Sequence, residues 1–322
     1  MAGPPRRSRK PWLIAGAVLA VAAGAGTSYV ALSGSPSSTG TNTASPTQST
    51  PPPTAPPTAP STASSAPGPD QATAPAVAAQ AADWIAANVG PGHVVACDVT
   101  VCAVLSGRGF PAASLITVQS RLSEVEQADV VVVTDVIRHQ LGAGLAGVTA
   151  DEPLAVFPTG SSGSSTVQIT AVALDGPTAR AGRLAADRAA RKAAGTALLR
   201  NPRIIVTGNA RAALSGGLVD SRVCALLAVL GGTHTVTIAS FTGSGPGAGA
   251  DVPLPDVVIS KIDGASATSD SPPAAALKSI VDAQRPPYSP LSTSSVASGP
   301  DQGLAIRFAQ PSPIGLLGAA PS

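Results

Sequence analysis

The chain has 322 residues, with 20 Lys and Arg against 18 Asp and Glu and a formal net charge of +2. Four of these cations, Arg6, Arg7, Arg9 and Lys10, precede the first acidic residue, Asp70, so 16 basic residues face 18 acidic ones in the rest of the chain. A balance this close to neutral gives no reason to expect nucleic acid as a partner.

Residues 12–32 form an uncharged, mostly apolar run directly after these four cations. A helix needs ~20 apolar residues to cross a bilayer, and cations mark its cytoplasmic flank. We therefore expect a cytoplasmic tail at 1–11, a single transmembrane helix at 12–32 in contact with the lipid bilayer, and an extracytoplasmic remainder. The alternative is a cleaved signal peptide, because Ala20-Val21-Ala22 and Ala23-Gly24-Ala25 offer small-residue cleavage sites.

Residues 33–75 consist mainly of Ser, Thr, Pro, Ala and Gly. Such a segment has almost no side chain larger than Ala to bury, and its prolines hold the backbone extended. The composition predicts a disordered linker between the membrane and the folded part.

Residues 76–175 alternate between helical and strand patterns. Asp98 and Asp135 each precede a predicted helix, and the strand at 128–134 is nearly all Val, which is typical of a strand buried on both faces. The alternation predicts a small, mostly parallel α/β sheet. The other predicted elements are a helix at 76–89 and strands at 93–97, 114–118, 154–157 and 166–173.

Four runs between residues 79 and 172 carry a family resemblance: ADWIAANVGPGHVVACDV, GRGFP, ADVVVVTDVIR and LAVFPTGSSGSSTVQITAV. They resemble the exported tail domains of actinobacterial membrane glycosyltransferases of the dolichyl-phosphate-mannose type. The resemblance implies a Rossmann-like domain outside the membrane. It does not carry over the transferase activity, because that family's active site lies in a multi-helix membrane body and one membrane helix is expected here.

Asp98 and Asp135 are the candidate ligand-binding residues, since each follows a strand at the edge where α/β proteins bind ligands. Helix capping is the alternative for both. The Gly-rich stretch 160–165 lacks the Lys and the following helix of a phosphate-binding loop, so it predicts a hairpin turn.

Residues 176–310 are predicted to form an α+β second part, followed by a frayed tail at 311–322. A helix capped by Thr178 carries a basic stretch that includes Arg188, Arg191 and Lys192. These three are the candidates for contact with anionic wall polymers or lipid headgroups, and a solvated face paired with acids is the alternative. The other predicted elements are helices at 209–217, 219–230 and 274–284 and strands at 201–208, 236–241, 257–262 and 304–308.

The run NPRIIVTGNARAALSGGLVDSRVCALLAVLGGTHTVTIASF resembles the N-terminal part of an actinobacterial module related to zinc D-alanyl-D-alanine carboxypeptidases. That family continues with a Ser-x-His-x-x-Gly-x-Ala-x-Asp segment, whereas residues 243–251 contain no His. His93, His139 and His234 have no ligand-like spacing. The resemblance therefore implies a degenerate, noncatalytic copy, and we expect no metal and no cofactor.

The chain has three cysteines, and an extracytoplasmic location permits disulfides. Cys97 and Cys102 could bridge a strand end to a helix, whereas Cys224 lies in an apolar helix and suits packing.

The sequence thus favours a single-pass envelope protein with a noncatalytic binding or scaffolding ectodomain, whose partner is a cell-wall polymer or another envelope protein. The alternative function is a cell-wall hydrolase or glycan-modifying enzyme with an unrecognised site.

Overall fold

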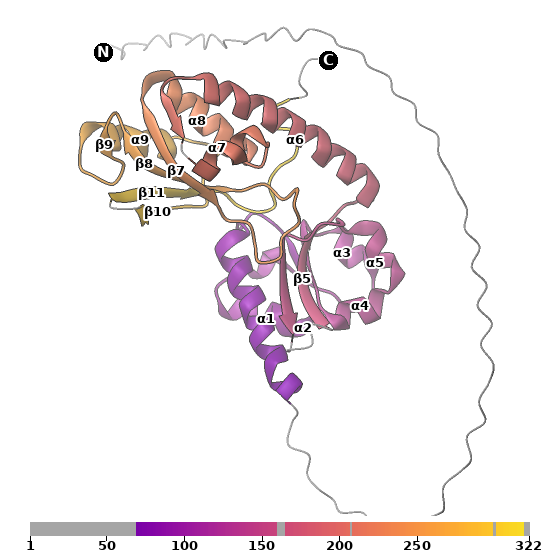
Figure 1. Ribbon diagram of the computed structural model, residues 1–322. Helices are drawn as coiled ribbons and strands as arrows, with labels where there is room; N and C mark the ends of the chain where they lie inside the picture. Colours follow the sequence, from indigo (N-terminus) through magenta and orange to yellow (C-terminus); the bar gives the residue numbers. More distant parts are fainter. Residues whose placement is uncertain (1–68, 160–164, 207, 299–300, 319–322) are drawn as a thin grey trace, which may run out of the picture. The chain divides into compact units, whose positions relative to one another are not determined.

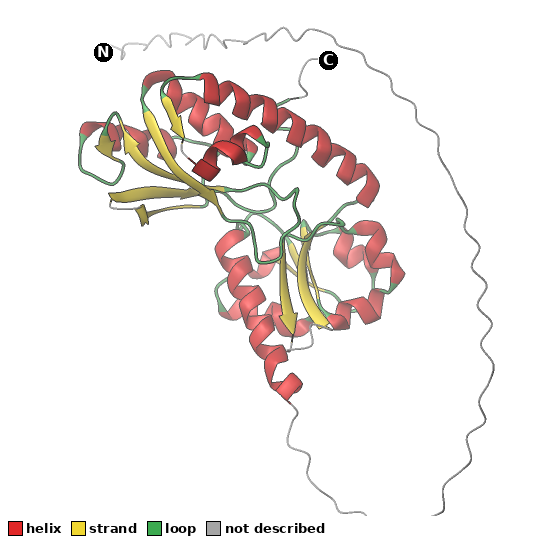
Figure 2. Cartoon of the chain, in the orientation of Figure 1, coloured by secondary structure: helices red, strands yellow, loops and turns green. Residues whose placement is uncertain are grey.

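The computed structural model describes residues 69–159, 165–206, 208–298 and 301–318 (Figure 1). The expected transmembrane helix at 12–32 and most of the expected linker lie outside these ranges, as does the Gly-rich stretch 160–164. No helix within the described ranges is long and apolar enough to cross a membrane. The described chain is a mixed α/β protein with two separate sheets (Figure 2).

The first sheet has five strands in the order β2-β1-β3-β5-β4. β1 (Val95–Cys97) pairs in parallel with β2 (Leu115–Thr117) and with β3 (Val130–Val133). β5 (Ser165–Ala171) and β4 (Ala155–Thr159) complete the sheet as antiparallel strands. The prediction of a mostly parallel sheet is therefore wrong, since two of its four strand pairs are antiparallel. β4 and β5 follow each other too closely in the sequence for the crossover that parallel strands need.

Helices cover both faces of this sheet. α1 (Pro69–Asn88) and α2 (Val99–Gly107) share one hydrophobic core with the strands. α3 (Leu122–Glu126), α4 (Asp135–Leu141) and α5 (Ala143–Val148) share another core on the opposite face. All four valines of β3 are buried, so the prediction that this strand is covered on both faces is confirmed.

The second sheet has the order β10-β11-β8-β7-β6, and the short β9 pairs with β8. Only β6 and β7 run parallel, and the other pairs are antiparallel. The strands are β6 (Ile204–Val206), β7 (Val236–Thr242), β8 (Asp256–Ile262), β9 (Ala265–Ser266), β10 (Ser292–Ser298) and β11 (Asp301–Arg307).

Four helices share a single core with this second sheet. They are α6 (Pro177–Arg200), α7 (Gly208–Ser215), α8 (Ser221–Thr233) and α9 (Pro272–Asp282). α6 begins after Gly176, so Thr178 is its second residue and not its cap.

The segment after β11 is held by specific hydrogen bonds. The Gln310 amide donates to the Asn88 carbonyl at 2.7 Å, and the Gly315 amide donates to Asp187 Oδ1 at 2.7 Å. The Ser312 hydroxyl donates to the Asp220 carboxylate. The prediction of a frayed tail is therefore wrong for residues 311–318, because their donors satisfy two buried carboxylates that the sequence alone did not place there.

Candidate functional site

Asp98 and Asp135 follow neighbouring strands, as predicted, but both are held by the protein itself. Asp98 is 6% exposed and accepts hydrogen bonds from the Val101 amide at 2.9 Å and from the Thr134 hydroxyl at 2.7 Å. Thr134 in turn accepts from the Ile137 amide and caps α4. Asp135 is exposed and pairs with Arg138 at 2.8 Å. Capping thus explains the burial of Asp98, and Thr134, rather than Asp135, is the cap of α4.

The three basic candidates do not form a common surface. Arg191 is 1% exposed and donates to Asp187 Oδ2 at 2.8 Å and to the Gly217 carbonyl at 2.6 Å. Arg188 forms an ion pair with Asp251. The prediction is therefore wrong for Arg191, which lies in the interior, whereas Arg188 is half-buried and Lys192 is exposed.

The cysteines divide into a bonded pair and a buried thiol. Cys97 and Cys102 form a disulfide that links β1 to α2, with their Cα atoms 5.5 Å apart. Cys224 is 2% exposed in α8, and burial, aided by the nearby charge of Asp220, raises the pKa of its thiol to about 12. A thiol that keeps its proton at neutral pH is a poor nucleophile, so Cys224 serves packing.

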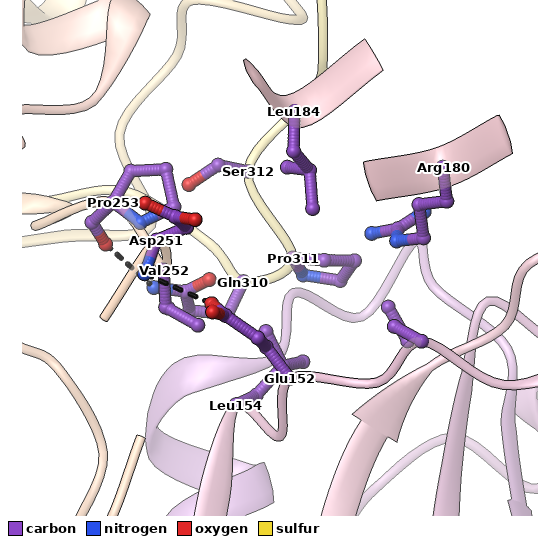
Figure 3. A pocket seen from close by; sticks show the side chains of 12 residues that line it. Glu152, Leu154, Arg180, Leu184, Asp251, Val252, Pro253, Gln310, Pro311 and Ser312 are labelled. Carbon is purple, nitrogen blue, oxygen red and sulfur yellow. Dashed lines mark hydrogen bonds between the residues drawn. The ribbon is translucent and has the colours of Figure 1, made fainter. Parts of the chain in front are cut away.

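A pocket that no sequence motif indicated lies where four segments meet (Figure 3). Arg180 and Leu184 reach it from α6, and Glu152 reaches it from the loop between α5 and β4. Asp251 comes from the loop before β8, and the segment 310–312 closes another side. The larger compartment of the pocket has a volume of about 160 Å³. This compartment is also lined by Ala150, Asp151, Pro177 and Ala181. Residues 310–312 line only the smaller compartment, which has a volume of about 20 Å³.

Two polar atoms in the walls of this pocket are buried and lack a hydrogen-bond partner among the described residues: Arg180 Nε and Gln310 Oε1. The remaining contacts of these side chains are long, since Arg180 Nη1 donates to the Val172 carbonyl at 3.4 Å and Gln310 Nε2 donates to the Pro253 carbonyl at 3.4 Å. Burial also lowers the pKa of Arg180. Buried polar atoms are nearly always paired in folded proteins, so an unpaired donor and an unpaired acceptor here point to a missing ligand or water.

The carboxylates of the pocket differ in how they are compensated. Glu152 Oε2 accepts from the Asp251 amide at 2.8 Å, and the Asp251 carboxylate is paired with Arg188. Within the described part of the chain, neither Asp151 nor Glu152 forms a salt bridge, and Asp151 is exposed. The pocket therefore combines one partly buried guanidinium with two carboxylates that form no salt bridge among the described residues, an arrangement that suits a ligand with charges of both signs.

Comparison with known proteins gives no match to any family model, curated protein or solved structure. In the described residues, no cluster of three or more His, Cys, Asp or Glu side chains is arranged to hold a metal ion.

Proposed function

We propose that this chain is a single-pass membrane protein of the cell envelope, with a cytoplasmic N-terminus and an extracytoplasmic, noncatalytic ligand-binding domain. The uncharged run at 12–32 and the four preceding cations support the anchor and its orientation. The Cys97–Cys102 disulfide supports an oxidising compartment, because such bonds persist mainly outside the cytosol. A resemblance to exported tail domains of actinobacterial glycosyltransferases agrees with this location.

The pocket beside Arg180 is the proposed binding site, and the observation that carries the proposal is the buried, unpartnered Nε of Arg180. An unpaired buried donor or acceptor costs ~1–3 kcal/mol. A ligand in the larger compartment that accepts from Arg180 Nε would remove the cost of this donor. Gln310 lines only the smaller compartment, whose volume of about 20 Å³ suits a water molecule. No such gain arises at Asp98, whose two oxygens already accept from Val101 and Thr134.

The ligand class follows from the charges and size of the pocket. A carboxylate on the ligand would pair with Arg180, and an ammonium group would pair with Glu152 or Asp151. A cavity of about 160 Å³ fits a ligand of amino-acid size or the end of a short peptide. The envelope partner is then a wall polymer or another envelope protein that presents such a zwitterionic end.

Isothermal titration of the purified chain with alanine and with alanyl-alanine tests this proposal. We expect binding of one or both zwitterions and no binding of acetate or ethylamine, each of which carries a single charge. Arg180→Gln should weaken binding about 10- to 100-fold, since hydrogen bonds to charged groups contribute roughly 1.5–3 kcal/mol.

The matched control is Arg183→Gln, because Arg183 lies one turn further along α6 and pairs with the exposed Asp175. This variant should bind as the wild type does. Equal affinity in both variants would contradict the proposed site. Release of free alanine from alanyl-alanine during the titration would instead favour the hydrolase alternative.

A further inference from the structure

The second sheet has one face in the hydrophobic core and one face outside it. Successive residues of a strand point to opposite faces of a sheet. Val257 and Ile259 of β8 belong to the core that the helices share, as do Leu304 and Ile306 of β11. The residues between them therefore lie on the other face.

Four polar residues form a row across this other face. In the register of the sheet, Arg307 of β11 lies opposite Ser292 of β10 on one side and opposite Asp256 of β8 on the other. Asp256 in turn lies opposite Thr242 of β7. The row therefore brings a cation, a carboxylate and two hydroxyl groups together from four different strands.

A cavity of about 330 Å³ lies over this row and the row next to it. The second row consists of Ser294, Ala305 and Val258, and Val296 and Ala297 complete the lining. Cavities that hold small molecules have volumes of ~300–1,000 Å³. The cavity thus has the size of a small-molecule site and combines a polar row with a row of small, mostly apolar side chains.

The Asp256 carboxylate is only half satisfied in this cavity. Asp256 is 4% exposed, and its Oδ2 accepts from Arg307 Nε at 3.0 Å. Its Oδ1 is buried and has no hydrogen-bond partner in the part of the chain that the structure describes. Burial raises the pKa of Asp256, although Arg307 acts in the opposite direction. Since buried polar atoms are nearly always paired, the carboxylate lacks a donor that a ligand could supply.

We propose that this cavity is a second binding site, and that its ligand is an uncharged sugar unit that bonds to Asp256 and Arg307. The ligand should be uncharged because the two side chains compensate each other at 3.0 Å. A cation near Asp256 would be repelled by Arg307, and an anion near Arg307 would be repelled by Asp256.

A sugar also matches the order of groups in the cavity. Two neighbouring hydroxyl groups supply a donor for the carboxylate and an acceptor for the guanidinium from adjacent carbon atoms. The C–H face of a sugar ring can pack on Ala305 and Val258. A peptide group suits the pair less well, because its trans geometry directs the N–H and the C=O to opposite sides.

NMR saturation transfer to glucose, mannose and galactose tests the proposal on the full chain in a sugar-free detergent. We expect at least one of the three sugars to bind and N-acetylalaninamide not to bind. If none of the sugars binds, or if only the amide does, the proposal is wrong. The cavity shares no residue with the Arg180 pocket, so sugar binding should persist in Arg180→Gln, and either proposal can fail without the other.

A matched pair of substitutions on β10 locates the site. Ser294 and Ser295 are both exposed, but only Ser294 lines the cavity, since the two side chains point to opposite faces of the sheet. Ser294→Leu fills part of the cavity and should weaken sugar binding about tenfold or more. Ser295→Leu should bind as the wild type does. Equal affinity of the two variants would place the sugar elsewhere and overturn the assignment.

Asp256→Asn tests the carboxylate itself, because it removes the charge with little change in size. The affinity for the sugar should fall about 10- to 100-fold, since hydrogen bonds to charged groups are stronger than those between neutral groups. The unfolding midpoint shows whether the variant is folded. A folded Asp256→Asn variant that binds the sugar as tightly as the wild type would contradict the role of Asp256, and if the variant does not fold, the two β10 variants decide.

Discussion

At the scale of single residues, the second half of the chain contains two buried Asp–Arg pairs, Asp187 with Arg191 and Asp220 with Arg222. Asp220 is fully buried, and its carboxylate accepts from Arg222 Nε at 3.0 Å and from Arg222 Nη2 at 2.7 Å. It also accepts from the Arg222 amide at 2.8 Å and so caps α8. Removal of the Asp220 charge is costly, because it leaves the Arg222 guanidinium buried without a counter-charge and without access to water.

We therefore expect Asp220→Asn to lower the free energy of unfolding by about 3–5 kcal/mol, since it leaves the buried Arg222 uncompensated. The control is Asp175→Asn, which breaks the solvent-exposed pair with Arg183 and should cost about 1 kcal/mol or less. Guanidinium denaturation followed by circular dichroism measures both values. Equal losses in the two variants would show that burial does not decide the strength of the Asp220 pair.

The sequence predicted some of these roles and could not predict others. It offered both ligand binding and capping for Asp98, and the structure shows the capping contacts. It placed Arg191 on a solvated face, because helical spacing alone cannot reveal that the Gly217 carbonyl and Asp187 enclose its guanidinium. Glu152 and Asp251 meet in the pocket although they lie 99 positions apart, and no local pattern records such a contact.

At the scale of elements, the packing of α6 on α7 depends on the absence of one side chain. A Cβ atom at Gly195 would lie 2.2 Å from the Leu214 carbonyl oxygen, which is backbone and cannot rotate away. Gly182 lies in the same helix, and a Cβ atom there would have no neighbour within 4 Å. Packing therefore requires glycine at position 195 and leaves room for a side chain at position 182.

This difference predicts opposite effects for the same substitution. Gly182→Ala should raise the free energy of unfolding by roughly 0.5–1 kcal/mol, because Ala has the higher helix propensity. Gly195→Ala should lower it by about 1–3 kcal/mol or more, because overpacking against backbone outweighs that gain. Thermal and chemical denaturation of the two variants provide the test. Stabilisation by Gly195→Ala would mean that α7 can move away from α6 at little cost.

Elements with a strong pattern were predictable, and weakly patterned ones were not. The valine run of β3 and the Asp98-capped helix α2 were found from the sequence. α3 and α5 have five and six residues, which is too short for a helical period to show. β10 lacks alternating apolar residues and becomes a strand because the more apolar β11, with Leu304 and Ile306 in the core, pairs along its full length.

At the scale of the whole described chain, backbone contacts join segments that the sequence assigned to separate parts. The Gln310 amide bonds to the Asn88 carbonyl, and the Gly249 amide donates to the Pro153 carbonyl at 2.9 Å. The Asp251 amide adds a contact to a side chain, since it donates to Glu152 Oε2 at 2.8 Å. These bonds tie the end of the chain and the loop before β8 to residues around the first sheet, which the sequence could not predict because each partner is remote along the chain.

Deleting residues 311–322 tests how far the C-terminal segment stabilises this arrangement. The deletion removes the hydrogen bonds from Ser312 to Asp220 and from Gly315 to Asp187, and so leaves two buried carboxylates each short of a donor. Hydrogen bonds to charged groups contribute ~1.5–3 kcal/mol each, so the free energy of unfolding should fall by about 3–6 kcal/mol. Deleting only residues 319–322 removes neither bond and should leave the unfolding midpoint unchanged. If the longer deletion unfolds at the same denaturant concentration as the shorter one, water must replace both donors, and the segment does not contribute to the stability of the fold.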